Sequence, residues 1–372
     1  MVVSTGILPS PNRVVVLMVA GIGNALMTQP MVRQLRIALP HARVVVVAKS
    51  KAMAEPFLRL AAPRPLDDVR IASKSSAALI RTLRDERADW LVIPFPSNRW
   101  QYNALAVASG AKHVLVHGYP PAHAASMGWS SVFKRVPAQN GIHDVLQNLQ
   151  LIRAAGLDVD LADAPNFNVT DDELAQADAL LENESQDNPH DNPIVVIHAG
   201  SAKTILAAAK RWPPENYARL IDEISKRNTH RIVLVEGPDE VGIAQHITSL
   251  LQHARVGKAL QVIPLNCPLG VSAGVLKRAQ LYIGTDSGLA HLAAAVGTRA
   301  VTLFAPADPD RVCPFGQRDR VIQPPVSCAP CFLYPYQSAR PAMRCSAPMC
   351  VQKITVESVI EQANRELNAS FR

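Results

Sequence analysis

The chain has 372 residues, 48% of them hydrophobic and 19% charged, a globular balance over a length that favours two domains rather than one. No run reaches the roughly 20 apolar residues of a membrane-spanning helix, and the N-terminus lacks the basic and apolar regions of a secretory signal. We therefore expect a cytoplasmic protein in which the six cysteines do not form a disulfide framework.

The net charge of +7 is carried by the first half of the chain. Up to Asp163 there are 18 Lys and Arg against 10 Asp and Glu, whereas the remainder holds 20 against 21. The cations are scattered and only 5% of the residues are aromatic, which disfavours nucleic acid as a partner. An anionic membrane face, a phosphorylated acceptor or an ordinary solvated surface would each account for the surplus.

Strand and helix patterns alternate through the first half. After a loose tail at residues 1–12, the apolar run at 13–19 is typical of a strand buried on both faces of a parallel sheet. A glycine turn, Gly21-Ile22-Gly23-Asn24, leads into a predicted helix at 25–39 and a strand at 43–47, which together form a β-α-β unit. The other predicted strands are 90–93 and 113–116, and the other predicted helices are 77–86, 102–109 and 143–155.

The same alternation restarts after an acidic, asparagine-rich segment at 182–192. Predicted strands follow at 194–197, 231–235, 261–263, 281–283 and 300–304, with helices at 213–227, 240–251 and 271–279. We expect an α/β protein with two doubly wound Rossmann-like domains and a ligand cleft between them. The expected boundaries are an N-terminal domain at 1–165, a linker at 166–192, a C-terminal domain at 193–353 with a cysteine-containing segment at 326–350, and a terminal helix at 354–372.

Four polar turns fall at the carboxyl ends of predicted strands, where doubly wound sheets bind their ligands. They are Gly21–Asn24, His198–Ser201, Glu236–Glu240 and Gly284–His291. The last turn precedes an apolar helix, whose free N–H groups and positive dipole end favour an anion.

Residues of this last turn suit such a site. Asp286 and Ser287 fall where their side chains could cap the helix, and Gly288 lets a ligand approach the backbone. His291 returns to the same face one turn later. An ordinary capped helix has the same pattern, so the turn alone does not establish a ligand site.

Two nucleotide-binding motifs are missing from the sequence. The first glycine turn lacks the third glycine of a dinucleotide fingerprint, because Leu26 occupies that position, and the following strand ends in Ala48-Lys49 instead of an acidic residue. No G-x-x-x-x-G-K-[ST] motif occurs. These observations disfavour an NAD enzyme and a P-loop enzyme.

The second half instead offers groups that suit a nucleotide diphosphate. Ser201 supplies a hydroxyl in a turn of small residues, and Lys210 and Arg211 supply cations for phosphate oxygens. Glu240 could accept hydrogen bonds from ribose hydroxyls. Each has a structural alternative, since the two cations can be solvated and Glu240 can be a carboxylate at a helix start.

Five motifs follow one another in the second half: His198-Ala199-Gly200-Ser201, Lys210-Arg211-Trp212-Pro213, Glu236-Gly237-Pro238-Asp239-Glu240, the run from Gly284 to Ala295, and Phe304-Ala305-Pro306. Their order resembles glycosyltransferase family 9, the ADP-heptose:lipopolysaccharide heptosyltransferases. The run from Gly21 to Pro30 is similar to the N-terminal G-D-x-x-x-T-x-P loop of that family. The resemblance covers most of the chain from Val14 to Val359 and implies a GT-B architecture, with the nucleotide sugar on the C-terminal domain and the acceptor on the N-terminal one.

The resemblance also implies roles for single residues. By it, Ser201 and Lys210 would contact the diphosphate, Glu240 the ribose, and Asp286, Ser287, Gly288 and His291 the diphosphate and sugar region. Inverting transfer in such folds needs no divalent metal, because cations and N–H groups neutralise the leaving diphosphate. A basic N-terminal domain suits a phosphorylated lipid A-core acceptor at the inner face of the cytoplasmic membrane.

One position departs from the family pattern. The family loop, to which Gly21, Gly23 and Asn24 correspond, carries an aspartate as general base where this chain has Asn24. An amide cannot take a proton from an acceptor hydroxyl near neutral pH. Another residue could be the base, with Asp144, His143 and Glu55 as candidates. Alternatively the acceptor differs, or the protein transfers slowly or not at all.

Four cysteines fall in the irregular, proline-rich segment near the C-terminus, with the spacing C-x2-C-x13-C-x4-C. They are Cys328, Cys331, Cys345 and Cys350. Four thiols with this spacing could hold a structural zinc or iron ion, which would have no open position for catalysis. Reduced cysteines packed as small hydrophobic side chains are the alternative, and we expect this for Cys267 and Cys313.

Three functions agree with these observations. The first is an inverting, metal-independent transfer of heptose from ADP-heptose to a lipopolysaccharide inner-core sugar. The second keeps a nucleotide-sugar donor but uses a protein or another polysaccharide as acceptor, which Asn24 and the cysteines both favour. The third is a nucleotide-sugar-binding paralogue without activity.

Overall fold

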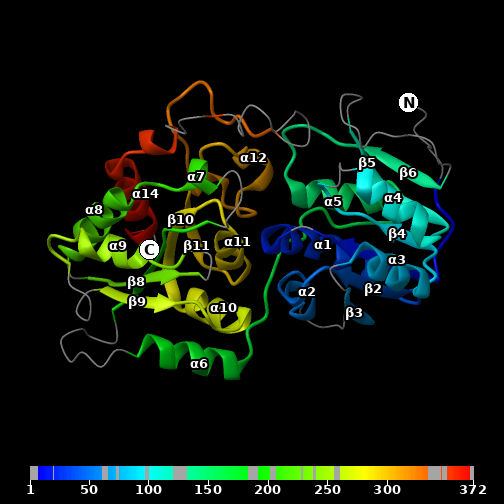
Figure 1. The fold of residues 1–372 in the computed structure, drawn as a ribbon, viewed down its shortest axis with the longest axis horizontal. Coiled ribbons are helices and arrows are strands. Elements are labelled where there is room, and N and C mark those ends of the chain that lie inside the picture. Colours follow the sequence, from blue (N-terminus) through cyan, green and yellow to red (C-terminus); the bar gives the residue numbers. More distant parts are fainter. Residues whose placement is uncertain are drawn as a thin grey trace. The chain divides into compact units, whose positions relative to one another are not determined.

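The computed structural model describes residues 7–19, 21–60, 66–72, 75–96, 100–119, 132–182, 192–201, 207–227, 229–237, 240–254, 260–333, 345 and 350–368. Residues 1–6 of the predicted tail, residues 183–191 of the acidic segment, and residues 334–344 and 346–349 of the cysteine segment lie outside these ranges. The chain forms two compact units, of which the first runs to Phe167 and the second starts at Asn168 (Figure 1). Within the described ranges, no helix has the length and apolarity of a membrane span.

The first unit is built on a parallel sheet of six strands in the order β3-β2-β1-β4-β5-β6. The strands are β1 (Arg13–Met18), β2 (Arg43–Ala48), β3 (Asp68–Ile71), β4 (Trp90–Val92), β5 (His113–Gly118) and β6 (Phe133–Pro137). The helices are α1 (Ile22–Ala38), α2 (Lys51–Leu58), α3 (Ser76–Asp85), α4 (Trp100–Ser109) and α5 (Asp144–Arg153). The central strands are runs of valine and leucine buried on both faces, which is why their patterns were continuous rather than alternating.

The second unit repeats this topology, with a parallel sheet in the order β12-β11-β10-β7-β8-β9. Its strands are β7 (Ile194–His198), β8 (Arg231–Glu236), β9 (Leu260–Pro264), β10 (Ala279–Thr285), β11 (Arg299–Leu303) and β12 (Val321–Ile322). Its helices are α6 (Asp171–Leu181), α7 (Ala207–Lys210), α8 (Pro214–Ser225), α9 (Ile243–Ser249), α10 (Leu269–Arg278), α11 (Gly288–Ala295), α12 (Pro309–Val312) and α14 (Val356–Asn368), with short 3-10 turns at Arg318–Arg320 and Val351–Lys353. The prediction of two doubly wound α/β units is confirmed, since in both sheets the strand order reverses next to the first strand of the unit.

Helix α6 lies within the segment predicted as a linker. Thr170 and Glu173 form a capping box at its start, and the helix packs on α10 (Figure 1). A Cβ atom on Gly270 would lie 1.8 Å from Glu173 Oε1, and one on Gly274 would lie 2.8 Å from the Cβ of Ala177. Glycine at both positions of α10 therefore allows the close approach of the two helices.

Several predicted boundaries were wrong. Helix α1 begins at Ile22, so the turn predicted at Gly21–Asn24 is its N-cap and first turn. Helix α9 begins at Ile243 instead of Glu240, after Gly242 in a left-handed conformation with φ of 97°. Strands β3 and β6 and helix α2 were missed. Strand β3 is short and partly exposed, and so has no apolar pattern to detect.

Candidate functional site

Three strand ends of the second unit meet at one edge of its sheet. Strand β7 lies between β10 and β8, with His198 in register with Gly284 on one side and Val235 on the other. The turns that follow these strands therefore start side by side. They carry the three polar motifs of the second half, as expected from the parallel sheet.

A buried ion pair joins the first two turns. His198 Nε2 lies 3.1 Å from Glu240 Oε2, and both side chains are less than 7% exposed. The same carboxylate oxygen accepts the backbone N–H of Gly237 at 2.9 Å. Burial raises the pKa of Glu240, but the hydrogen bonds from His198 and Gly237 and the charges of His198 and Arg211 outweigh it, so the pKa lies below its usual value.

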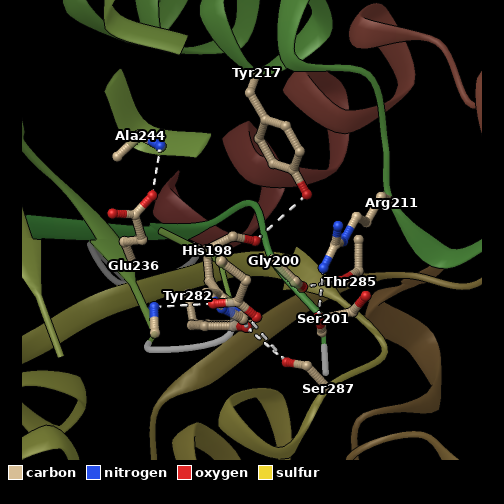
Figure 2. Close-up of polar contacts among 12 residues, drawn as sticks. His198, Gly200, Ser201, Arg211, Tyr217, Glu236, Ala244, Tyr282, Thr285 and Ser287 are labelled. Carbon is tan, nitrogen blue, oxygen red and sulfur yellow. Dashed lines mark hydrogen bonds and ion pairs between the residues drawn. The ribbon is translucent and has the colours of Figure 1, made fainter. Parts of the chain in front are cut away.

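The other side of the imidazole faces two hydroxyls. His198 Nδ1 lies 3.2 Å from Tyr282 Oη and 3.5 Å from Ser287 Oγ, and the two hydroxyl oxygens are 3.4 Å apart. Figure 2 shows His198, Tyr282 and Ser287 converging from β7, β10 and the turn after β10. Nε2–H donates to the Glu240 carboxylate, which fixes the orientation of the imidazole ring. Burial raises the pKa of Tyr282, which keeps its hydroxyl a donor.

Glycine is required where Glu240 enters this site. A Cβ atom on Gly200 would lie 2.0 Å from Glu240 Cδ, and one on Gly237 would lie 2.8 Å from Glu240 Oε2. The Gly200 carbonyl accepts a hydrogen bond from Thr285 Oγ1 at 2.8 Å, which fixes the turn after β7 to the end of β10 (Figure 2). The small residues of the His198–Ser201 turn thus make room for a buried carboxylate.

Helix α11 begins at this edge without a side-chain cap. Ser287 is its N-cap residue with φ of −149°, yet in the described chain its side chain accepts no N–H of the helix. The expectation that Ser287 and Asp286 cap the helix is therefore wrong. Ser287 Oγ instead joins the His198 network and Asp286 pairs with Lys210, which leaves the positive end of α11 to another acceptor.

Cations gather next to this helix start. Lys210, at the end of α7, forms an ion pair with Asp286, and the two side chains are 21% and 11% exposed. Arg211 Nη2 donates to the Ser201 carbonyl at 3.0 Å (Figure 2), while its buried Nε has no hydrogen-bond partner among the described residues. Ser201 itself is buried.

His291 lies in the first turn of α11 and is buried. Burial lowers its pKa, as does the charge of Lys210, while Asp286 opposes them. The imidazole is thus held neutral and can donate or accept one hydrogen bond. This imidazole, Lys210, Arg211 and the uncapped helix start are groups that can bind an anion with several oxygen atoms.

In the first unit, Gly21, Gly23 and Asn24 lie at the carboxyl end of β1. Gly21 is the N-cap of α1, and Asn24 is in the first turn, where its carbonyl accepts a hydrogen bond from Thr28 Oγ1 at 2.8 Å. This first turn contains no acidic residue. The strand order reverses between β1 and β4, so the turn sits at the switch point of the sheet.

Helices α1 and α5 pack together in the first unit. Asn148 Nδ2 lies 3.4 Å from the Met27 carbonyl and 3.5 Å from Thr28 Oγ1. Asp144 precedes Asn148 by one helical turn, and Asn24 precedes Thr28 by one turn. Asp144 and Asn24 therefore lie toward the N-terminal ends of the two packed helices.

The three candidate bases differ in their surroundings. Asp144 is 1% exposed, and the Nδ1 of His143, the N-cap of α5, accepts the Val145 N–H at 3.2 Å. Glu55 is bound to Arg59 one turn later on α2, with an N–O distance of 2.9 Å. The structure thus places Asp144 and His143 at the start of α5, and Glu55 in an ion pair.

The four clustered cysteines do not form a metal centre in the described structure. Cys328 and Cys345 are exposed, and Cys331 and Cys350 are partly buried. Burial raises the pKa of Cys331, and the charges of the other three thiols add to this, so the four lie near one another. Among the described residues, however, no three His, Cys, Asp or Glu side chains are grouped so that they could hold a metal ion.

Sequence reasoning missed the network around His198. The sequence motif around His198 predicts no role for the imidazole, and Tyr282 is predicted only as part of a strand. A tyrosine within the buried run Leu281–Ile283 of β10, two residues before Gly284, was the available signal, because positions 282 and 284 share one face of the strand. A Cβ atom on Gly284 would lie 2.5 Å from Tyr282 Oη.

Two doubly wound α/β units in one chain are the architecture of the GT-B fold. Residues 76–339 match the profile of glycosyltransferase family 9 (heptosyltransferase), and the chain belongs to this family. It is 22% identical over 306 residues to lipopolysaccharide heptosyltransferase 3 of Escherichia coli, covering 77% of this chain and 81% of the relative.

Solved structures share the whole fold. The family 9 glycosyltransferase of Veillonella parvula superposes with a TM-score of 0.77 at 20% identity, covering 96% of this chain and 98% of the other. The E. coli ADP-heptose lipopolysaccharide heptosyltransferase II gives 0.70 at 20% identity, covering 97% and 100%. The predictions of the family, the GT-B fold and glycosyltransferase activity are confirmed.

Proposed function

We propose that this glycosyltransferase moves heptose, with inversion, from ADP-heptose to an inner-core sugar of lipopolysaccharide. The observation that carries the proposal is the uncapped start of α11 beside Lys210, which suits a diphosphate. Family members with this activity support the choice of sugar, including an E. coli heptosyltransferase solved with ADP-2-deoxy-2-fluoro heptose, at 19% identity and a TM-score of 0.63 over 95% of this chain and 99% of the other.

In this proposal the donor is held by the second unit. Lys210, Ser201 and the N–H groups at Ser287 and Gly288 bind the diphosphate, and His291 binds the diphosphate or the sugar. Asp286 keeps Lys210 in place through their ion pair. These cations and N–H groups stabilise the charge that develops on the leaving diphosphate, and so transfer needs no divalent metal.

Glu240 is proposed to meet the ribose with one oxygen only. Its Oε2 is held by His198 and Gly237, so Oε1 is the atom left for a ribose hydroxyl. The depressed pKa of Glu240 keeps the carboxylate ionised, so that both of its oxygens act as acceptors.

The acceptor is proposed to bind the basic first unit, as a phosphorylated lipid A-core at the inner face of the cytoplasmic membrane. Asn24 cannot act as the general base there. We place the base at the start of α5, where Asp144 is a buried carboxylate and His143 is the alternative.

A second candidate changes the acceptor to a protein side chain or another polysaccharide. The replacement of the family's aspartate by Asn24 favours a different acceptor, and so does the cysteine segment. An iron-containing dodecameric glycosyltransferase of E. coli, TibC, has the same fold with a TM-score of 0.56 at 14% identity, covering 97% of this chain and 77% of the other. A nucleotide-sugar-binding protein without transfer activity is the third candidate.

We further propose that Cys328, Cys331, Cys345 and Cys350 hold a structural zinc or iron ion. Four neighbouring thiols are a donor set that both metals accept, although binding requires the thiols to converge further than they do in the described structure. Metal analysis of protein purified without chelator tests this. About one ion per chain, lost in a Cys328→Ser/Cys331→Ser variant but kept in Cys267→Ser, supports the site, and a content far below one ion removes it.

The donor assignment is tested by a thermal-shift and turnover screen over ADP-heptose, UDP-sugars and GDP-sugars. A donor that binds the folded state raises the melting temperature in proportion to the logarithm of its concentration over its dissociation constant. We expect ADP-heptose to give the largest shift, and transfer to core oligosaccharide but not to protein acceptors. Stabilisation without turnover on any acceptor indicates the non-catalytic protein, and no stabilisation by any nucleotide sugar rejects all three candidates.

A further inference from the structure

A basic hollow lies in the first unit at the amino ends of its strands, the edge opposite Asn24. It has a volume of about 690 Å³, and the charged residues that line it are Arg13, Arg43, Arg84, Arg87, Asp85 and Asp89. Ligands of doubly wound sheets are expected at the other edge, so the proposed transfer reaction does not account for this hollow.

Two of the arginines are neighbours in the sheet. Arg13 and Arg43 are the first residues of β1 and β2 and are paired in the parallel register, so their side chains leave the same face. Like charges in such a pair are unfavourable unless something offsets them. Arg13 Nη1 donates to a carbonyl, that of Glu86 at 2.7 Å, while Arg43 Nη2 lies 3.4 Å from Asp68. The nearby carboxylates therefore compensate this pair only in part.

The other two arginines come from the end of α3. Arg84 Nε donates to the Ala108 carbonyl at 2.7 Å. Arg87 has φ of 46°, and in the described part of the chain it is the one residue other than glycine with a positive φ. The same part of the chain offers no hydrogen-bond or ion-pair partner to the Arg87 guanidinium. A left-handed arginine is costly, and here it carries an unpaired charge at the hollow.

Both carboxylate oxygens of Asp89 already have hydrogen-bond partners within the protein. Its Oδ2 accepts the N–H groups of Asn12 and Arg13 at 2.8 and 3.0 Å, and Lys112 Nζ lies 2.7 Å from Oδ1. The hydrogen bond from Lys112, with those N–H groups, holds the pKa of Asp89 below its usual value despite burial. Four arginines against two aspartates leave a surplus of two positive charges among the charged residues that line the hollow.

We propose that this hollow binds a phosphate monoester, either free in solution or as the headgroup of a lipid. A phosphate monoester carries about −1.5 to −2 charges at neutral pH, which matches the surplus. Guanidinium groups bind phosphate oxygens in a bidentate geometry, and arginine binds phosphate more specifically than lysine for this reason. This site is separate from the donor site and independent of the proposed transfer reaction.

The variant Arg87→Gly tests the site without a folding defect. Glycine adopts a positive φ freely, so the melting temperature should stay the same or rise, while the affinity for inorganic phosphate should fall about tenfold. Titration calorimetry is done in a Lys210→Gln background, which suppresses phosphate binding at the donor site. Arg43→Gln should also weaken binding, whereas the matched control Arg219→Gln/Arg278→Gln, which removes two exposed arginines of the second unit, should not.

The source of the phosphate is decided with vesicles. Binding to phosphatidic acid vesicles that exceeds binding to phosphatidylcholine vesicles and is lost in Arg87→Gly indicates a lipid headgroup. Phosphate binding that depends on Arg87, without vesicle binding, indicates a soluble ligand. If Arg87→Gly and Arg43→Gln both bind phosphate and vesicles as the parent protein does, or if the parent binds neither, the proposal is overturned. Stabilisation by nucleotide sugars is expected to be the same in Arg87→Gly as in the unsubstituted protein.

Discussion

Glu240 occupies the space into which a side chain on Gly200 would project. A Cβ atom at position 200 would lie 2.0 Å from Glu240 Cδ and 2.3 Å from Oε1. The carboxylate could make room only by leaving His198 and Gly237, both of which it binds through Oε2.

Gly200→Ala should therefore lower the free energy of unfolding of the second unit by about 1–3 kcal/mol, through overpacking and loss of a buried pair. The control is Gly118→Ala, because a Cβ atom there would meet its nearest neighbour at 3.7 Å. Urea unfolding of both variants gives the comparison. Equal stability of the two variants would show that the Glu240 side chain has another place to go.

Lys210→Gln should weaken ADP-heptose binding about 10- to 100-fold, since a charge-assisted hydrogen bond contributes about 1.5–3 kcal/mol. The loss has a second cause, because Asp286 is left unpaired near the phosphate oxygens. The double variant Lys210→Gln/Asp286→Asn should recover part of the affinity. Lys226→Gln removes an exposed lysine, one paired with Glu223, and should bind like the unsubstituted protein. Calorimetry that shows equal affinities for Lys210→Gln and Lys226→Gln contradicts the placement of the diphosphate.

His117 should make the first unit less stable in mild acid. The side chain is 1% exposed, and burial lowers its pKa from 6.5 to about 3. The hydrogen bond that its Nε2 donates to the Gln147 carbonyl at 3.1 Å opposes this shift. The folded protein keeps His117 neutral, while the unfolded chain takes up a proton below pH 6.5. Stability is therefore lost as the pH falls from 6.5 toward 3, by about 2 kcal/mol at pH 5.

Hydrogen exchange of the β5 amides at pH 7 and pH 5, corrected for the intrinsic exchange rates, measures this loss. In His117→Gln the difference between the two pH values should shrink by about 2 kcal/mol. His113→Gln, at the start of the same strand, serves as the control. If the stability of His117→Gln still falls as much between pH 7 and pH 5, another titrating group causes the effect.

Asn24→Asp should raise the transfer rate if Asn24 faces the acceptor hydroxyl, because a carboxylate restores a general base at that position. The substitution should also stabilise α1 by about 0.3–1 kcal/mol, since the first turn of this helix has no acidic residue to interact with the dipole. The pH dependence of kcat distinguishes the two effects. Rates that are unchanged or abolished, in a variant at least as stable as the parent, tell against this position for the base. Asn24→Ala is the neutral control and should show no gain.

Much of the fold followed from local patterns. Runs such as Val14 to Leu17 are continuous and apolar because both faces of the strand are covered, and so they identified the parallel sheets. The short polar strand β3 gave no such signal. Helix α6 was missed although the Thr170–Glu173 capping box is visible in the sequence. The asparagine-rich segment that follows the helix led to the prediction of one linker over the whole region.

The site was predictable at the level of turns and not of contacts. Parallel strands bring His198, Glu236 and Thr285 to one edge, so the three motifs had to be neighbours. Which groups pair was not predictable, since the His198–Glu240 pair joins residues 42 positions apart. Ser287 was expected to cap α11, but its hydroxyl instead contacts the Tyr282 hydroxyl and the His198 imidazole. A helix pattern in the sequence does not indicate these contacts.

The contact between Gly200 and Glu240 also constrains the order in which this chain can change during evolution. A larger residue at position 200 is accessible only after the side chain at 240 has been shortened, and the same holds for Gly237, whose Cβ atom would lie 2.8 Å from Glu240 Oε2. Shortening Glu240 first removes a partner from His198. Each single step is therefore expected to lower the stability of the fold, and positions 200, 237 and 240 are expected to vary together or not at all.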